Sequence, residues 1–306
     1  MPIGAENIKT KAAHLGFSFC GIAEAAPLSD QRSFYEYFIR KKLHCTLSYL
    51  ETNLETRLDP LRMMPDARSV IAVLLNYYPD ELIPDEDNFI ISKYAYGRHY
   101  HHVMRRTHEL ADFIRQEDGK IKARAFADSG TVMEKVWAQR CGLGWQGKNT
   151  LLINKNAGSF FFIGIILTNL DLLPDKPETD HCSSCDKCIK ACPTGALRRP
   201  YELDISKCIS YRTIESKVPI PEELKGTFND RIYGCDICQD VCPFNKFARP
   251  AEMTEFSTHE ALKRLRKKDW MALTELQFKE LFKDSAIART GYIQFMKNIR
   301  FVSSLD

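Results

Sequence analysis

Eight of the eleven cysteines of this 306-residue chain lie between Cys182 and Cys242, and their spacing constrains the fold more than any other feature. The first run has the spacing C-x2-C-x2-C-x3-C-P and consists of Cys182, Cys185, Cys188, Cys192 and Pro193. Bacterial ferredoxins bind [4Fe-4S] clusters with this spacing. A second run lacks its leading cysteine and consists of Cys235, Cys238, Cys242 and Pro243, with Cys208 as the unassigned cysteine nearby. The sequence therefore predicts two [4Fe-4S] clusters with eight cysteine ligands.

The assignment of ligands follows from two-cluster ferredoxins, in which the fourth cysteine of each run binds the other cluster. The first cluster is then held by Cys182, Cys185, Cys188 and Cys242. The second is held by Cys192, Cys208, Cys235 and Cys238. Structural zinc is the alternative because C-x2-C pairs also bind zinc, but the triple run and the two Cys-Pro pairs favour clusters. The clusters could be architectural, although delivery of electrons to another site in the chain is the better interpretation. Isolated cysteines are usually small buried hydrophobic residues, and we expect this of Cys20, Cys45 and Cys141.

Composition and charge exclude several classes of protein. The 43 Lys and Arg exceed the 40 Asp and Glu by only three, too small a surplus to indicate a nucleic-acid binder by itself. No uninterrupted apolar run reaches the roughly 18 residues of a membrane span. The first eleven residues include Glu6, Lys9 and Lys11 and lack the apolar block of a secretory signal. We therefore expect a cytoplasmic protein without a membrane segment, where cysteines serve metal or redox chemistry.

The chain divides into three predicted regions in an α+β fold: an α/β domain over residues 1–178, a ferredoxin-like double-cluster domain over 179–250 and a short helical tail over 251–306. We expect helices near 5–15 and 100–117 and strands near 18–22, 69–77, 122–127, 150–153 and 159–169. Thr131 and Glu134 have the spacing of a capping box, which predicts a helix from Thr131 until Gly142. The segment LPDKP at 173–177 is a plausible linker, and the tail should be helical near 261–268 and 276–282.

Several motifs together resemble epoxyqueuosine reductase. They are Ala127-Asp128-Ser129-Gly130, Glu134, the segment GLGWQGKNTLLI at 142–153, and the segments 91–101, 208–215, 229–235 and 285–298 beside the double-cluster block. The resemblance covers nearly the whole chain. It implies a cobalamin-dependent oxidoreductase that removes the epoxide oxygen of epoxyqueuosine in a tRNA anticodon loop, the last step in making queuosine. One departure is that Gly97-Arg98 is followed by His99-Tyr100-His101, where the family often has Asp-Tyr-His.

The chemistry that the resemblance implies needs two electrons and an acid. By this resemblance Asp128 is the general acid for the departing oxygen and also contacts the cofactor. An ordinary role is equally open to it, because Asp is a preferred cap residue and a helix is predicted to begin nearby. The sequence lacks the D-x-H-x-x-G motif, so we expect the cobalt of cobalamin to have no lower histidine ligand from the protein.

The remaining cobalamin contacts implied by the resemblance are Arg57, Ser92, Leu152, Ile163, Glu215 and Asp236, several of them through backbone groups. Each has a simpler alternative. Leu152 and Ile163 lie in apolar strand patterns and could be core residues. Arg57 could be an ordinary surface charge.

Contacts with tRNA need clustered basic residues. The predicted set contains five basic residues within 263–268 and three more in the tail: Lys263, Arg264, Arg266, Lys267, Lys268, Arg289, Lys297 and Arg300. A solvated helix face is the alternative. A second basic patch is formed by Arg98, Arg105, Arg106, His101 and His102.

We expect a monomer whose partners are tRNA and an external electron donor. Two other functions stay open at this point. One is a ferredoxin-like electron carrier without catalytic activity, which would bind no corrinoid. The other is a reductive dehalogenase-like corrinoid enzyme, which the basic tail and the absence of an export signal disfavour.

Overall fold

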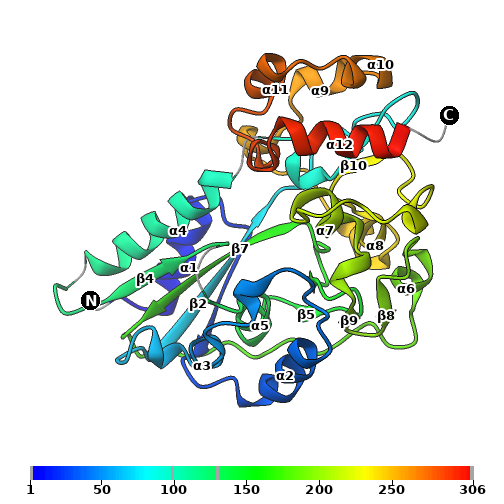
Figure 1. Cartoon of the computed structure of the whole chain (residues 1–306). Coiled ribbons are helices and arrows are strands. Elements are labelled where there is room, and N and C mark those ends of the chain that lie inside the picture. Colours follow the sequence, from blue (N-terminus) through cyan, green and yellow to red (C-terminus); the bar gives the residue numbers. More distant parts are fainter. Residues whose placement is uncertain (1–2, 98–99, 117, 129–130, 304–306) are drawn as a thin grey trace.

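The computed structural model describes residues 3–97, 100–116, 118–128 and 131–303 (Figure 1). Within these ranges no helix is both long and apolar enough to cross a membrane. The helices are α1 (Ala5–His14), α2 (Arg32–Arg40), α3 (Leu54–Leu58), α4 (Tyr100–Arg115), α5 (Glu134–Arg140), α6 (Lys187–Ala191), α7 (Ile209–Ile214), α8 (Ile237–Asp240), α9 (Glu260–Arg264), α10 (Lys267–Met271), α11 (Glu275–Leu281) and α12 (Tyr292–Ser303). The strands are β1 (Phe19–Glu24), β2 (Ser69–Asn76), β3 (Ile90–Ile91), β4 (Ala123–Phe126), β5 (Trp145–Gln146), β6 (Leu152–Ile153), β7 (Phe161–Thr168), β8 (Leu197–Arg199), β9 (Glu202–Leu203) and β10 (Arg231–Tyr233).

A four-stranded antiparallel sheet forms the centre of the N-terminal half, in the order β1-β2-β7-β4. The central strand β2 has the continuous apolar sequence SVIAVLLN, and all of its residues but the last are buried. Its register with β7 runs from Ser69 opposite Thr168 to Asn76 opposite Phe161. Such an unbroken apolar strand requires cover on both faces of the sheet.

Helices provide that cover on both sides, as Figure 1 shows. On one face α1 and α4 pack through residues such as Ile8 and Leu110 onto Ile71 of β2. On the other face α5 packs through Trp137 onto a second core. Gly164 of β7 brings α4 close, because a Cβ atom there would lie 2.3 Å from Thr107 Oγ1. The N-terminal half is therefore a three-layer helix–sheet–helix arrangement.

The cysteine-rich half joins this unit through the chain segment before α4. Helices α6 and α8 pack against each other, and β8 pairs with β9. Strand β10 pairs in parallel with β3, so residues 231–233 share a two-stranded sheet with residues 90–91. A third core combines three segments distant in sequence, including Phe89, Ile91, Tyr96, Phe228, Ile232, Tyr233, Trp270, Phe282 and Phe295.

The last helix closes this third core with a polar contact as well as apolar ones. The amide of Asn298, which is fully buried, donates hydrogen bonds to the carbonyls of Thr213 (2.8 Å) and Ile232 (3.0 Å). It thereby ties α12 to both α7 and β10.

The mixture of helices and sheet agrees with the predicted fold class, but three local predictions need correction. The T-x-x-E pattern is not a capping box: α5 begins at Glu134 with Met133 as its N-cap, and the Thr131 hydroxyl lies 3.6 Å from the Met63 sulfur. The basic tail segment is not one helix, because Leu265 and Arg266 are extended and separate α9 from α10. The predicted linker is fixed to the sheet, since the Asp175 carboxylate accepts hydrogen bonds from the Ile22 amide (2.9 Å) and Lys9 Nζ (2.7 Å).

Candidate active site

The eight cysteines of the double-cluster motif lie on short helices and on the turns beside them. Cys188 is within α6 and Cys238 within α8, while Cys208 is the N-cap residue of α7. Cys192 and Cys242 each follow one of these helices, and each precedes a proline. Short helices with turns at both ends thus present the sulfur atoms from several directions.

The electrostatic neighbours of the thiols divide them into two groups. Burial raises the pKa of Cys188, and the charges of Cys182, Cys242 and Cys185 raise it further. Cys242 in turn has Cys182 and Cys185 as its cysteine neighbours. These four are the cysteines that crossed ligation assigns to the first cluster.

The other group behaves in the same way. Burial raises the pKa of Cys238 well above its usual value, and among the cysteines Cys235 and Cys208 contribute most, with a smaller contribution from Cys188 of the first group. Cys208 has Cys192 as its cysteine neighbour. Among the described residues no three His, Cys, Asp or Glu side chains form a group that could hold a single metal ion. The side chains present fit two groups of four sulfurs, as two [4Fe-4S] clusters require.

Two residues of the glycine-rich segment after α5 support the loop of the first group. The buried indole of Trp145 donates a hydrogen bond from Nε1 to Cys182 Sγ at 3.4 Å. The ammonium of Lys148 donates to the carbonyls of Ser183 (2.5 Å) and Cys185 (2.9 Å). This segment therefore holds the cysteine loop in place.

A second site is formed around Asp128, which follows β4 and is exposed with a left-handed backbone (φ 47°). Tyr49 is 57% exposed, but partial loss of hydration raises the pKa of its hydroxyl; the charges of Glu215 and Asp128 raise it further, while Arg57 and Arg289 oppose it. These five side chains are therefore neighbours, although they come from four separate segments. Asp128 is not a helix cap, because α5 begins six residues later.

The buried side chain of Arg57 holds the position of Tyr49. Its guanidinium donates hydrogen bonds to the carbonyls of Tyr49 (2.8 Å) and Thr52 (3.3 Å). The alternative that Arg57 is a surface charge is therefore wrong. Glu215, at the end of α7, forms an ion pair with Arg289.

Two residues at the start of α5 connect the site around Asp128 to the second cysteine group. Burial raises the pKa of Glu134 to about 7, and the charge of Asp128 contributes. Lys135 is accessible to solvent, but the surrounding protein removes part of the hydration of its ammonium, which lowers its pKa. The negative charges of Glu134 and Cys238 act in the opposite direction and raise it. Lys135 Nζ also donates to the Thr150 carbonyl at 2.8 Å.

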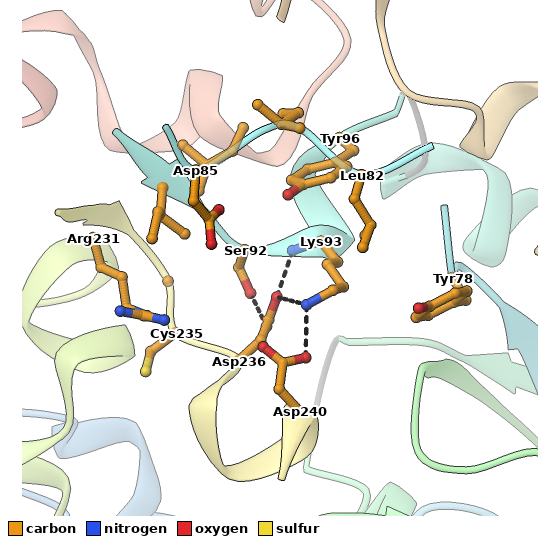
Figure 2. Close-up of a pocket in the computed structure, with 14 residues that line it drawn as sticks. Tyr78, Leu82, Asp85, Ser92, Lys93, Tyr96, Arg231, Cys235, Asp236 and Asp240 are labelled. Atoms are coloured by element: carbon orange, nitrogen blue, oxygen red, sulfur yellow. Dashed lines mark hydrogen bonds and ion pairs between the residues drawn. The ribbon is translucent and has the colours of Figure 1, made fainter. Parts of the chain in front are cut away.

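The four other predicted cofactor contacts, Ser92, Asp236, Leu152 and Ile163, are not among the neighbours described around Asp128. Ser92 and Asp236 are both buried and hydrogen-bonded to each other, and Lys93 Nζ lies 3.7 Å from Asp236 and 2.6 Å from Asp240 (Figure 2). Gly234, with φ +71°, allows this approach because a Cβ atom there would lie 2.4 Å from Ser92 Cβ. These residues border a cavity of about 350 Å³. Leu152 is a core residue, and Ile163 is half-buried beside the same core.

The predicted tRNA contacts fall into two kinds. Lys263 pairs with Glu81 and Glu260 at 2.8 Å, Lys267 pairs with Asp230 at 2.9 Å, and Arg289 pairs with Glu215. Arg266 donates to backbone carbonyls of residues 263 and 265. Of the predicted tRNA contacts, Arg264, Lys268, Lys297 and Arg300 are exposed and form no ion pair with the described residues.

The second basic patch is mostly neutralised. Arg105 pairs with Glu109 at 2.8 Å and Arg106 with Glu255 at 2.7 Å. Arg98 lies outside the described residues.

Sequence reasoning did not identify Tyr49, Lys135 or the acidic role open to Glu134. Tyr49 is recognisable only from the fold, because residues 48–50 carry no motif. Glu134 was assigned to a capping box that does not form.

Two family models match the chain. One is described as a 4Fe-4S double cluster binding domain and covers residues 181–245, and the other is described as epoxyqueuosine reductase QueG and covers residues 57–129. Epoxyqueuosine reductase of Cellulophaga algicola is 46% identical over 299 residues, which are 97% of each chain. That of Escherichia coli is 35% identical over 301 residues, 96% of this chain and 79% of the relative.

Solved structures agree with these sequence relatives. A crystal structure of epoxyqueuosine reductase with an epoxyqueuosine-modified tRNA-Tyr stem loop has a TM-score of 0.87 at 29% identity, covering 97% of this chain and 80% of that one. A Bacillus subtilis epoxyqueuosine reductase, described with its catalytic aspartate loop swung out of the active site, has a TM-score of 0.87 at 28% identity, covering 97% and 80%. A catabolic reductive dehalogenase shares the fold alone, with a TM-score of 0.52 at 20% identity over 98% of this chain and 38% of that one.

The fold, the two cysteine groups and the matched cluster domain define an iron–sulfur oxidoreductase. Relatives at 35–46% identity over nearly the full chain specify the kind. The chain belongs to the epoxyqueuosine reductase family. The prediction of the family is confirmed, and the interpretation as an electron carrier without catalytic activity is wrong.

Proposed function

We propose that this protein reduces epoxyqueuosine to queuosine in a tRNA anticodon loop, using cobalamin and two [4Fe-4S] clusters, with Asp128 as the proton donor. The observation that carries the proposal is the gathering of Asp128, Tyr49, Arg57 and Glu215 next to Glu134. This group is open to solvent at Asp128 and reaches the second cysteine group through Lys135. The proposed source of protons thus lies near the second cysteine group, the proposed source of electrons.

Removal of an epoxide oxygen as water consumes two electrons and two protons. Cobalamin, when bound, would supply a strongly reducing cobalt centre. Asp128 is exposed at the end of β4 and is the carboxyl group of this site with access to an incoming base. Glu134 stays protonated up to a pH of about 7 because burial disfavours its charged form, so it can hold a second proton beside Asp128.

The residues that would hold cobalamin lie around Asp128 and beside the neighbouring core. Arg57 and Glu215 contribute charges at the site around Asp128, while Leu152 and Ile163 contribute apolar surface or backbone groups. Ser92 and Asp236 are hydrogen-bonded to each other, so we propose that they act by fixing the backbone between β3 and α8.

The substrate proposal draws on the stem-loop complex of the relative and on the exposed basic residues of the tail. A modified base must leave its stack to enter a cleft, which is easiest from a single-stranded loop. Arg264, Lys268, Lys297 and Arg300 are free to contact phosphates, which position RNA without selecting the base. A tRNA substrate would also place the enzyme in the cytoplasm.

The test uses anaerobically reconstituted protein with and without added cobalamin, a chemical reductant, and three substrates: an epoxyqueuosine stem loop, an unmodified stem loop and a small organohalide. We expect queuosine to form only from the modified stem loop and only with cobalamin. Equal turnover without cobalamin would contradict the cofactor. Preferential reduction of the organohalide would contradict the substrate and support the dehalogenase alternative.

A second test concerns the tail. Replacing Arg264, Lys268 and Arg300 with Ala should reduce the slope of log K against log salt for the stem loop by about 2 to 3, since each phosphate contact contributes about 0.7 to 0.9. Lys263→Ala is the matched control, because its ammonium already pairs with two carboxylates. An unchanged slope in the triple variant would show that tRNA binds elsewhere.

A further inference from the structure

The two cysteine groups differ in how close they lie to the surface. The first group is flanked by exposed residues, among them Ser183, Ser184 and Lys187. The second has a more buried surrounding: α7, which follows Cys208, is buried from Tyr211 to Ile214, and Asp236 and Gln239 beside Cys235 and Cys238 are buried too, although Lys207 before Cys208 is exposed. Electrons from outside would therefore enter at the first cluster.

A hollow lies directly beside a ligand of that first cluster. It has a volume of about 510 Å³, and its lining includes Cys242, Tyr78, Phe160, Asp240, Lys187 and Lys246. The two lysines come from different elements, Lys187 from α6 and Lys246 from the turn after Cys242, and both are exposed. The adjacent ring of Phe247 is 40% exposed, and Lys246 Nζ lies 4.8 Å from its centroid.

The charge of this surface is positive because its acidic residues are already paired. Asp240 pairs with Lys93 at 2.6 Å, and Asp186 pairs with Lys190 at 2.9 Å. In the described part of the chain, neither Lys187 nor Lys246 forms an ion pair. Two uncompensated cations and an exposed aromatic ring thus surround the hollow at Cys242.

We propose that this surface, formed by Lys187, Lys246 and Phe247 around the hollow at Cys242, is the docking site of a small acidic one-electron carrier protein. In each encounter the reduced carrier transfers one electron to the first cluster, which passes from the 2+ to the 1+ state while the carrier is oxidised by one electron. No proton moves in this step. Two encounters supply the two electrons of one turnover. The inference rests on the two clusters of the proposed function, but not on cobalamin or tRNA.

An acidic carrier is favoured over RNA because of where the charge lies. Long-range attraction between opposite charges raises association rates by about 10- to 1,000-fold. Lys187 and Lys246 line the same hollow as the cluster ligand Cys242, which is useful for electron transfer but not for binding phosphates. The unpaired basic residues proposed for tRNA lie elsewhere, on the tail helices. RNA binding at this surface is therefore an outcome that the test distinguishes.

The test measures electron transfer in stopped flow, with the reconstituted full chain, no cobalamin and no tRNA. The probe is a chemically reduced, acidic plant-type [2Fe-2S] ferredoxin, whose potential of about −400 mV makes it a strong reductant. The variant is Lys187→Glu with Lys246→Glu. The control is Lys225→Glu with Lys279→Glu, which changes the net charge equally on exposed elements outside this surface.

We expect the first double variant to lower the second-order rate constant at low ionic strength by about tenfold or more, and the difference to vanish at high salt. The control should stay within about twofold of the wild type. Iron content and cluster potentials, measured on every variant, identify damage to the cluster itself. Should the charge reversal damage the cluster, Lys187→Gln with Lys246→Gln gives the same test with a smaller expected loss.

Three results would overturn the proposal: a wild-type rate in the charge-reversed variant, an equal loss in the control, or a loss of affinity for the stem loop with unchanged electron transfer. Each can occur while the modified stem loop is still reduced with a chemical reductant. Failure of the docking site is therefore distinguishable from failure of the proposed function.

Discussion

The hydrogen bond from Trp145 to Cys182 gives a quantitative prediction for the first cluster. Trp145→Phe removes the indole N–H that lies 3.4 Å from Cys182 Sγ, while an aromatic ring is kept between His181 and Phe244, each with its ring centroid 4.8 Å from that of Trp145. A hydrogen bond to a cluster sulfur is stronger in the reduced state, which carries more negative charge. Its removal should therefore lower the reduction potential.

The size of the shift follows from the energy of the bond. A net hydrogen bond contributes about 0.5–1.5 kcal/mol. For a one-electron couple, about 1.4 kcal/mol corresponds to about 59 mV, so the expected decrease is ~20–65 mV. The measurement is an anaerobic redox titration followed by electron paramagnetic resonance on the reconstituted protein.

Trp137→Phe is the matched control for the loss of ring volume. Trp137 is buried like Trp145, but in the described part of the structure its Nε1 has no hydrogen-bond partner. Its substitution should leave the potential unchanged. A Trp145→Phe potential within about 10 mV of the wild type, or the same shift in both variants, would refute the reasoning.

Three further predictions concern the site around Asp128 and the cysteine ligands of the second cluster. Asp128→Asn should retain clusters and cobalamin but lower turnover of the modified stem loop by about 100-fold or more, the usual contribution of a positioned acid; wild-type turnover would remove Asp128 from the mechanism. Cys208→Ser should lower the iron content of reconstituted protein from about eight towards four per chain, and an unchanged content would show that Cys208 is not a ligand. The pKa of Glu134 is raised to about 7 in the folded protein, so the unfolded carboxyl releases its proton at a lower pH than the folded one. The contribution of Glu134 to the free energy of unfolding is therefore present at low pH and is lost as the pH rises through 7. Glu134→Gln should therefore gain stability relative to the wild type from pH 5.5 to 7 and then level off, which chemical denaturation at several pH values can check; a constant difference would contradict the raised pKa.

The apolar strands were predictable from the sequence because burial on both faces leaves a continuous signal. β2 is such a strand, and the structure places it within one residue of the expected bounds. The cysteine groups were predictable because ligand spacing is a local property. By contrast, Tyr49 and Glu215 become neighbours of Asp128 only through tertiary packing, so their place at this site has no local signature in the sequence.

Charge clusters were the least predictable feature. Five basic residues within 263–268 indicate a phosphate-binding surface, yet Lys263 and Lys267 pair with acidic residues from other segments. A count of charges along the chain carries no information about partners that arrive from elsewhere in the fold. Only the structure separates the paired cations from the free ones.

The third core has a consequence for how this protein is made in the cell. Its members come from residues 83–96, 209–233 and 262–302, and Asn298 of α12 binds the backbone of α7 and β10 from within. During synthesis the large aromatic side chains of the first two segments stay exposed to solvent until α12 has left the ribosome. The second cysteine group, in which Cys208 directly precedes α7 and Cys235 closely follows β10, can reach its final arrangement only then. Iron insertion at this group is therefore a late event in biogenesis, and a stalled or truncated chain would leave it accessible to oxidation and to aggregation.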